Sequence, residues 1–157
     1  MNKISYLILT IFIVGCNPGY RGLTQDEMAK VESEITSLFD QYFDSIRKDG
    51  LTGEFKYLDH SADFFWVPPG YQNPIPYDSV AAVLTLNAPR FTSVENMVDT
   101  LRIIPLSTEL ATYTAKLRSV MKDTSGNVSS LRLIETGVVI KRKDGWKLLH
   151  GQTSLLP

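Results

Sequence analysis

The feature that most constrains the fold is a change in hydrophobic periodicity near residue 93. From there on, apolar residues recur at every second position, which is typical of β-strands with one buried face. Four long strands are expected, at residues 94–104, 109–121, 128–142 and 146–155. Residues 123–127 and 143–145 combine Asp with Gly, as β-hairpin turns do. The second half of the chain is therefore predicted to be an antiparallel meander.

The segment at residues 24–49 has the pattern of an amphipathic helix, with apolar residues every three or four positions along one stripe. Thr24 and Glu27 have the spacing of a capping box, and Gly50 suits the end of the helix. Shorter elements are expected after it: a helix or turn at 53–57, a strand at 63–67 and a helix at 77–88. Helices followed by a meander predict an α+β fold, with the long helix packed on one face of a strongly curved sheet.

Composition excludes several classes of function. The 157 residues suit one domain, and 16 Lys and Arg against 17 Asp and Glu give a net charge of −1, which argues against nucleic-acid binding. One cysteine excludes a disulfide framework, and two histidines argue against a His-rich metal site. The sequence contains no phosphate loop, dinucleotide fingerprint or serine elbow. We therefore expect no metal and no cofactor.

The first residues indicate a targeting segment. Lys3 precedes an apolar run at 4–14, which is shorter than the roughly 20 residues that a membrane-spanning helix needs. The run ends in Ile-Val-Gly-Cys, which resembles the lipobox of bacterial lipoproteins. The resemblance implies a signal peptide at 1–15, a lipidated Cys16, and a tether at 16–23 that holds the domain near a bilayer. The alternatives are an ordinary signal peptide or a core strand, with Cys16 incidental. We expect a cell-envelope protein, anchored in the outer membrane and facing the periplasm.

Three segments carry a resemblance to a known superfamily: FFWVPPG at 64–70, ATYTAKL at 111–117 and ETGVVIKRKDGWKLLHGQTS at 135–154. Together with the order of elements, they resemble nuclear-transport-factor-2-like (NTF2-like) domains, which include the SnoaL-like and ketosteroid-isomerase-like groups. The resemblance implies a cystatin-like cone over residues 24–157, a pocket between helix and sheet, and a homodimer formed through the sheet.

Strand parity and the resemblance together suggest which residues line such a pocket. The candidates are Tyr42, Trp66, Tyr113, Glu135, Gly137, His150 and Gly151. Two simpler interpretations remain open. The aromatic residues are equally compatible with an ordinary core, and the two glycines with bulges that curve the sheet.

Three residues are candidates for acid–base chemistry. Glu135 lies between apolar neighbours, where burial would raise its pKa; the simpler alternative is an exposed carboxylate paired with Arg102, Arg118 or Arg132. Asp63 precedes a predicted strand, near the place where related isomerases carry their base, and is otherwise an ordinary strand-edge residue. His150 is a pocket proton donor or base, or else a structural histidine.

No motif selects a catalytic set among these residues. The sequence therefore favours a non-catalytic module that binds a small apolar or amphipathic ligand. The first alternative is an accessory protein that docks another envelope protein through its sheet, and the second is an isomerase- or hydrolase-like enzyme. A carboxyl of perturbed pKa in an open pocket would favour the enzyme, and a pocket filled by its own side chains would favour the accessory role.

Overall fold

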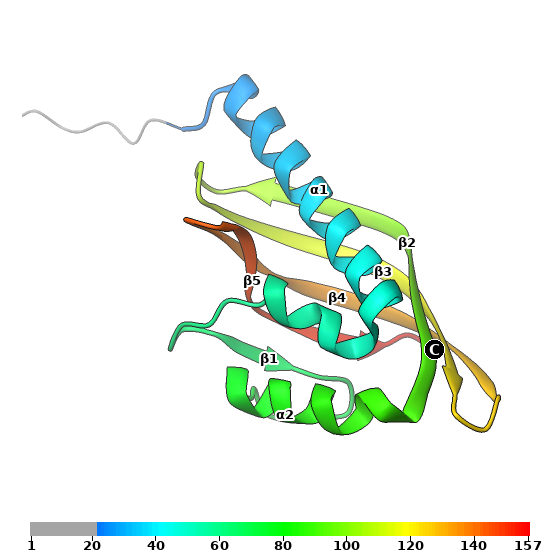
Figure 1. Ribbon diagram of the computed structural model, residues 1–157. Helices are drawn as coiled ribbons and strands as arrows, with labels where there is room; N and C mark the ends of the chain where they lie inside the picture. The colour runs from blue at the N-terminus through cyan, green and yellow to red at the C-terminus, as the bar shows by residue number, and fades with distance from the viewer. Residues whose placement is uncertain (1–21) are drawn as a thin grey trace, which may run out of the picture.

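The computed structural model describes residues 22–157. The signal peptide, Cys16 and most of the tether predicted above lie outside these residues. The long helix α1 (Gln25–Asp49) leads into the 3-10 helix η1 (Gly50–Tyr57), the short strand β1 (Phe65–Val67) and helix α2 (Tyr77–Asn87). After the short 3-10 helix η2 (Ala88–Arg90) come four long strands: β2 (Phe91–Pro105), β3 (Leu110–Asp123), β4 (Val128–Arg142) and β5 (Gly145–Leu155) (Figure 1).

Helix α1 begins and ends where the sequence predicts. The Thr24 hydroxyl accepts a hydrogen bond from the Glu27 amide at 3.2 Å, and the Glu27 carboxylate accepts one from the Thr24 amide at 2.8 Å. This is the predicted capping box, which satisfies amides that have no partner within the helix. Gly50 ends the helix at a φ of 70°, a conformation that costs little only for glycine.

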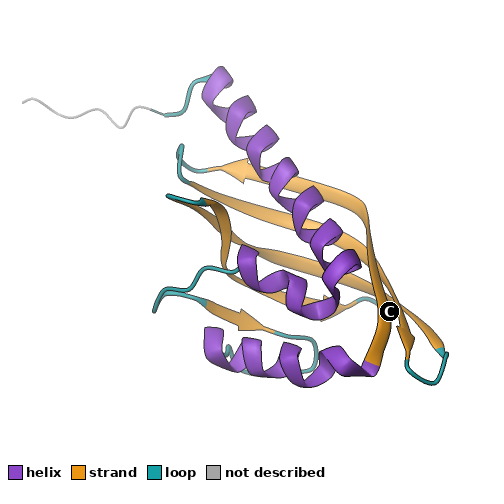
Figure 2. Cartoon of the chain, viewed as in Figure 1, coloured by secondary structure: helices purple, strands orange, loops and turns teal. Residues whose placement is uncertain are grey.

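The five strands form one sheet in the order β1-β5-β4-β3-β2. The four long strands pair antiparallel in sequence, and β1 joins the edge parallel to β5. The sheet curves around α1, η1 and α2, which lie on one side of it (Figure 2). The predicted α+β fold with a helix-covered curved sheet is confirmed.

A β-bulge in β5 decides which of its side chains face the helices. Val138 pairs with His150 and Val139 pairs with Leu148, so Leu149 is an extra residue without its own partner. One extra residue reverses the alternation that follows it. Leu148 faces the helices before the bulge, and after it Gly151 and Thr153 do so, because they pair with Gly137 and Glu135 of the inner face.

The core lies between the sheet and α1. Its aromatic part joins Phe39 of α1 to Tyr113 of β3, with ring centroids 4.6 Å apart.

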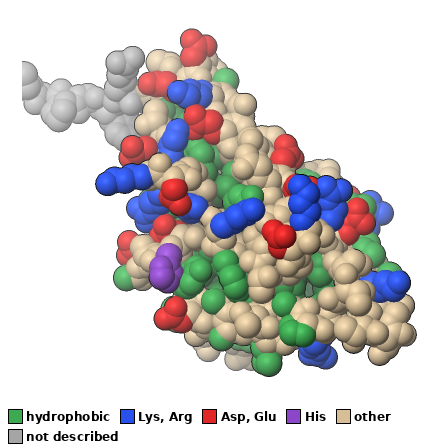
Figure 3. Space-filling view, in the orientation of Figure 1, with side chains coloured by type: hydrophobic (Ala, Val, Ile, Leu, Met, Phe, Trp, Pro, Cys, Tyr) green, Lys and Arg blue, Asp and Glu red, His purple; other side chains and the backbone are tan. Residues whose placement is uncertain are grey.

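On the face shown in Figure 3, acidic and basic side chains are interspersed along α1, so this face carries no continuous patch of one sign. Among residues 22–157, no helix is both long enough and apolar enough to cross a membrane.

Candidate functional site

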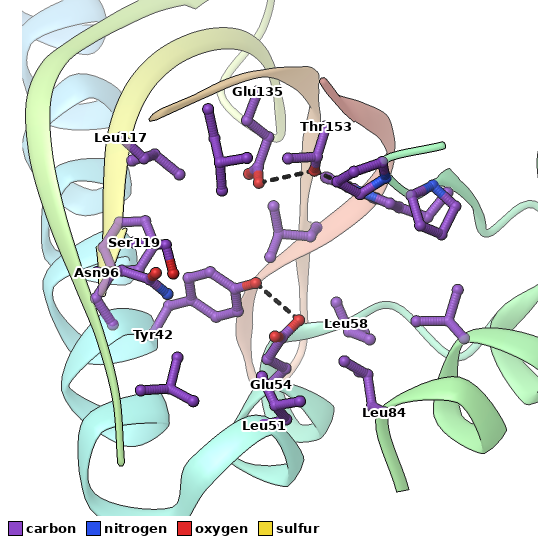
Figure 4. Close-up of a pocket in the computed structure, with 18 of the residues that line it drawn as sticks. Tyr42, Leu51, Glu54, Leu58, Leu84, Asn96, Leu117, Ser119, Glu135 and Thr153 are labelled. Carbon is purple, nitrogen blue, oxygen red and sulfur yellow. Dashed lines mark hydrogen bonds between the residues drawn. The ribbon is translucent and has the colours of Figure 1, made fainter. Parts of the chain in front are cut away.

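The space between the sheet and the three helices α1, η1 and α2 contains a cavity of about 280 Å³. This is close to the lower end of the ~300–1,000 Å³ that ligand pockets usually have. Its lining is mostly aliphatic and aromatic, and its carboxyl groups lie at two places, with the uncharged side chains of Asn96 and Ser119 elsewhere on the wall (Figure 4). Exposed Pro69 and half-buried Met121 and Leu131 also line it, so the cavity reaches solvent on that side.

The first polar group comes from the helical side. The Tyr42 hydroxyl of α1 donates a hydrogen bond of 2.9 Å to Glu54 Oε2 of η1. Gly53 makes this position possible, because a Cβ there would lie 2.5 Å from the carbonyl oxygen of Ser45. The absence of a side chain at Gly53 lets η1 lie against α1, and Glu54 then points into the cavity.

The second polar group comes from the sheet. Glu135 of β4 is 6% exposed and accepts hydrogen bonds on both oxygens, from the Tyr113 hydroxyl at 2.6 Å and the Thr153 hydroxyl at 3.2 Å. The Trp66 indole donates to the Thr153 oxygen at 3.0 Å. Figure 4 shows Glu135 and Thr153 on one side of the cavity and the Tyr42–Glu54 pair on the other.

Burial perturbs the pKa of both carboxyls. It raises the pKa of Glu54 to about 7, with a smaller contribution from the negative charge of Glu135. It also raises the pKa of Glu135, although the bonds from Tyr113 and Thr153 act in the opposite direction. The Glu54 side chain is half-buried, because part of its surface faces the open cavity. Protein atoms surround its carboxyl group closely enough for burial to raise the pKa. Near neutral pH, Glu54 is therefore present in both protonation states.

The described residues that line the cavity include no Lys, Arg or His. No cationic side chain among these residues therefore neutralises the two carboxyls. Nor does the described part of the chain bring three or more His, Cys, Asp or Glu residues together as a possible metal site. The ionisable groups of the cavity are two glutamates and a tyrosine. Such groups can exchange protons with a ligand, and carboxylates can also bind a cation or accept hydrogen bonds from a ligand.

Three of the seven predicted pocket residues, Tyr42, Trp66 and Glu135, line the cavity. The alternative of an exposed Glu135 paired with an arginine is wrong, because Glu135 is buried and bonded to Tyr113 and Thr153. Tyr113 is itself a core residue that reaches the site only through this bond.

Gly137 and Gly151 do not line the cavity, which corrects their predicted place. They pair with one another across β4 and β5. A Cβ at Gly137 would lie 3.0 Å from the Tyr113 ring, and one at Gly151 would lie 2.9 Å from the Trp66 ring. The aromatic rings therefore occupy the space that the missing side chains leave on the inner face. The two glycines instead line a shallow hollow on the outer face of the sheet, together with His150. The bulge lies at Leu149 and at neither glycine.

His150 and Asp63 are also outside the cavity, contrary to the pocket prediction for His150. The bulge turns His150 to the outer face of the sheet, where its ring stacks on Phe65 with centroids 4.6 Å apart. Asp63 is exposed in the turn before β1, where its amide donates to the Ser61 hydroxyl. Neither residue is near the carboxyls of the cavity.

Sequence reasoning missed Glu54. It lies in η1, an eight-residue 3-10 helix in which no hydrophobic period distinguishes inward from outward positions. The one available signal was Gly53 directly before it, since a glycine within a helical segment often marks a close approach of two backbones.

Comparison with known proteins agrees with this architecture. The family model for the SnoaL-like domain matches residues 35–157. Among curated proteins, none matches the sequence. A protein from Novosphingobium aromaticivorans that is provisionally named a scytalone dehydratase superposes with a TM-score of 0.75 at 12% identity, over 85% of this chain and 89% of that chain.

Two other solved structures superpose with lower TM-scores. An NTF2-like superfamily protein from Salmonella enterica serovar Typhimurium gives a TM-score of 0.67 at 18% identity, covering 82% of this chain and 93% of its own. A hexachlorocyclohexane dehydrochlorinase gives 0.67 at 13% identity, covering 85% and 90%. At such low identity these likenesses establish the fold alone, and the family model covers most of the chain. The chain therefore belongs to the SnoaL-like domain family, with the NTF2-like fold.

Proposed function

We propose that this protein binds a small, mainly apolar molecule in the cavity between the sheet and the helices, as a lipid-anchored module of the cell envelope. The observation that carries the proposal is an open cavity of about 280 Å³ with an apolar lining and a few convergent polar groups. This combination is typical of small-molecule sites. A cavity that reaches solvent argues against the accessory role, for which the protein's own side chains would fill the space.

A cavity-filling variant tests binding. Leu133 lines the cavity from β4 and is half-buried, so Leu133→Trp would occupy part of its volume. Ile104→Trp is the matched control, because Ile104 is 45% exposed and pairs with Thr112, away from the cavity. Native mass spectrometry of the purified protein should show an added mass that leaves on unfolding, in wild type and in Ile104→Trp only. An added mass retained by a folded Leu133→Trp variant would place binding elsewhere.

The lipid anchor rests on the lipobox-like sequence before Cys16, the one cysteine of the chain. Two or three acyl chains hold a protein stably at a membrane, whereas one chain does so only marginally. The Cys16→Ala variant should lose acyl labelling and leave the membrane fraction. Continued labelling of this variant would refute the anchor.

The pKa of Glu54 supports a second candidate function, which is acid–base catalysis. A carboxyl with a pKa of about 7 exchanges protons readily at neutral pH, and the Tyr42 hydroxyl beside it is a hydrogen-bond donor. One structural neighbour is provisionally named a dehydratase, and that name fits chemistry of this kind. The test is deuterium exchange at carbon next to the carbonyl of small ketones in D₂O, followed by NMR. Exchange that persists in Glu54→Gln would exclude Glu54 as the base.

A further inference from the structure

We propose that the cavity selects small apolar amines, whose ammonium group would form an ion pair with the Glu54 carboxylate. This inference rests on the proposed function, because it specifies the class of molecule that the cavity binds. Three features of the cavity carry it: the sign of its charges, the open hydrogen-bonding position on Glu54, and the aromatic rings around it.

The charges of the cavity favour a cation. Glu54 and Glu135 are its acidic side chains, and Lys, Arg and His are absent from the described residues that line it. A carboxylate enclosed by protein gains most from an opposite charge close to it, and a second carboxylate nearby increases that gain. When the two carboxyls are ionised, an anionic ligand would meet like charges from two sides, and a neutral ligand would bring no opposite charge.

The hydrogen bonds single out Glu54 as the partner. Both oxygens of Glu135 are occupied, by the Tyr113 and Thr153 hydroxyls. Glu54 Oε2 accepts from Tyr42, whereas Oε1 has no hydrogen-bond or ion-pair partner in the described part of the chain. An ammonium group brings three donors, so one of them can take this open position.

The remaining lining suits the rest of such a molecule. The Tyr42, Phe43, Phe64 and Trp66 side chains line the cavity, and cations are attracted to the faces of aromatic rings. Leu84 and Leu133 supply apolar surface. A volume of about 280 Å³ suits a ligand with a single ring or a short branched chain.

Calorimetric titration of the full chain in detergent tests the inference with three matched probes: 2-phenylethylamine, 2-phenylethanol and phenylacetate. At pH 8 the amine should bind at least tenfold more tightly than the alcohol, and phenylacetate should bind least. Glu54→Gln should reduce the amine's affinity at least tenfold and change the alcohol's less than twofold. Glu32→Gln, on the exposed side of α1, controls for general charge effects and should change neither.

The pH dependence gives an independent readout. The titratable groups that face Glu54 are Tyr42 from α1, Tyr113 from β3 and Glu135 from β4. Aliphatic amines stay charged between pH 5.5 and 8. The amine's affinity should therefore rise across this range as Glu54 ionises, and binding near pH 7 should release protons. The alcohol's affinity should not follow this trend.

The outcomes separate the inference from the proposed function. Equal binding of amine and alcohol, insensitive to Glu54→Gln and abolished by Leu133→Trp, would overturn the selection of amines and leave the cavity as a ligand site. Binding of no probe to any variant would overturn the inference too, and the native-mass measurement would then decide the proposed function separately. Tighter binding of phenylacetate than of the amine would refute the charge argument directly.

Discussion

Replacing Glu54 with glutamine should remove a pH-dependent penalty from the folded protein. Burial raises the pKa of Glu54 from 4.5 to about 7, and one pKa unit corresponds to about 1.4 kcal/mol. Up to about 3 kcal/mol of folding free energy therefore depends on the protonation of this group. The glutamine side chain of Glu54→Gln would keep an oxygen for the Tyr42 hydroxyl and would carry no charge at any pH.

The sign follows from the direction of the shift. Well below pH 4.5, Glu54 is protonated in both the folded and the unfolded chain, so its ionisation costs the folded protein no stability. As the pH rises toward 7, the unfolded chain ionises first, and the free energy of unfolding of the wild type falls by up to about 3 kcal/mol. Glu54→Gln lacks this loss and should be the more stable protein at pH 8.

Urea unfolding at several pH values between 4.5 and 8, followed by tryptophan fluorescence, measures this effect. The difference in unfolding free energy between Glu54→Gln and wild type should grow with pH by about 2–3 kcal/mol. Glu32→Gln, with an exposed side chain on α1, should parallel the wild type. Burial also raises the pKa of Glu135, so a slope of the same sign should remain in Glu54→Gln. A difference that does not vary with pH would refute the burial of Glu54.

Three further substitutions test contacts that stabilise the fold around the site. Gly137→Ala should destabilise by about 1–3 kcal/mol in urea unfolding, because its Cβ would lie 2.6 Å from a backbone oxygen and 3.0 Å from the Tyr113 ring. Asp59→Asn should cost about 2 kcal/mol at pH 7, since Asp59 receives two hydrogen bonds from Arg142, at 2.8 and 2.9 Å. Arg142 lowers the pKa of Asp59, so this difference should disappear as the pH falls below 3.8. Thr24→Ala should lower the thermal midpoint through loss of the capping box, worth about 1 kcal/mol.

The elements of the fold could be predicted because each has a local physical signature. The stripe of α1 and its caps at Thr24 and Gly50 are encoded within a few residues of one another. The hairpin at 123–127 is likewise local, since the Asp123 carboxylate accepts the amides of Ser125 and Asn127. Periodicity and turn chemistry were therefore sufficient for the α+β arrangement.

The site was less predictable because it depends on contacts between distant segments. A single bulge at Leu149 reverses the alternation in β5, so His150 faces outward and Thr153 takes the inward position beside Glu135. Glu54 enters the cavity only because Gly53 lies against Ser45 of α1. Hydrophobic periodicity predicts neither the position of a bulge nor the close approach of two helices.

The most direct test is a crystal structure of the protein with saturating 2-phenylethylamine at pH 8. We expect density for the amine in the cavity, with its nitrogen within hydrogen-bonding distance of Glu54 and its ring against Leu84 and Leu133. A cavity closed by rotation of Tyr42 or Trp66, with the amine excluded from it, would contradict the account.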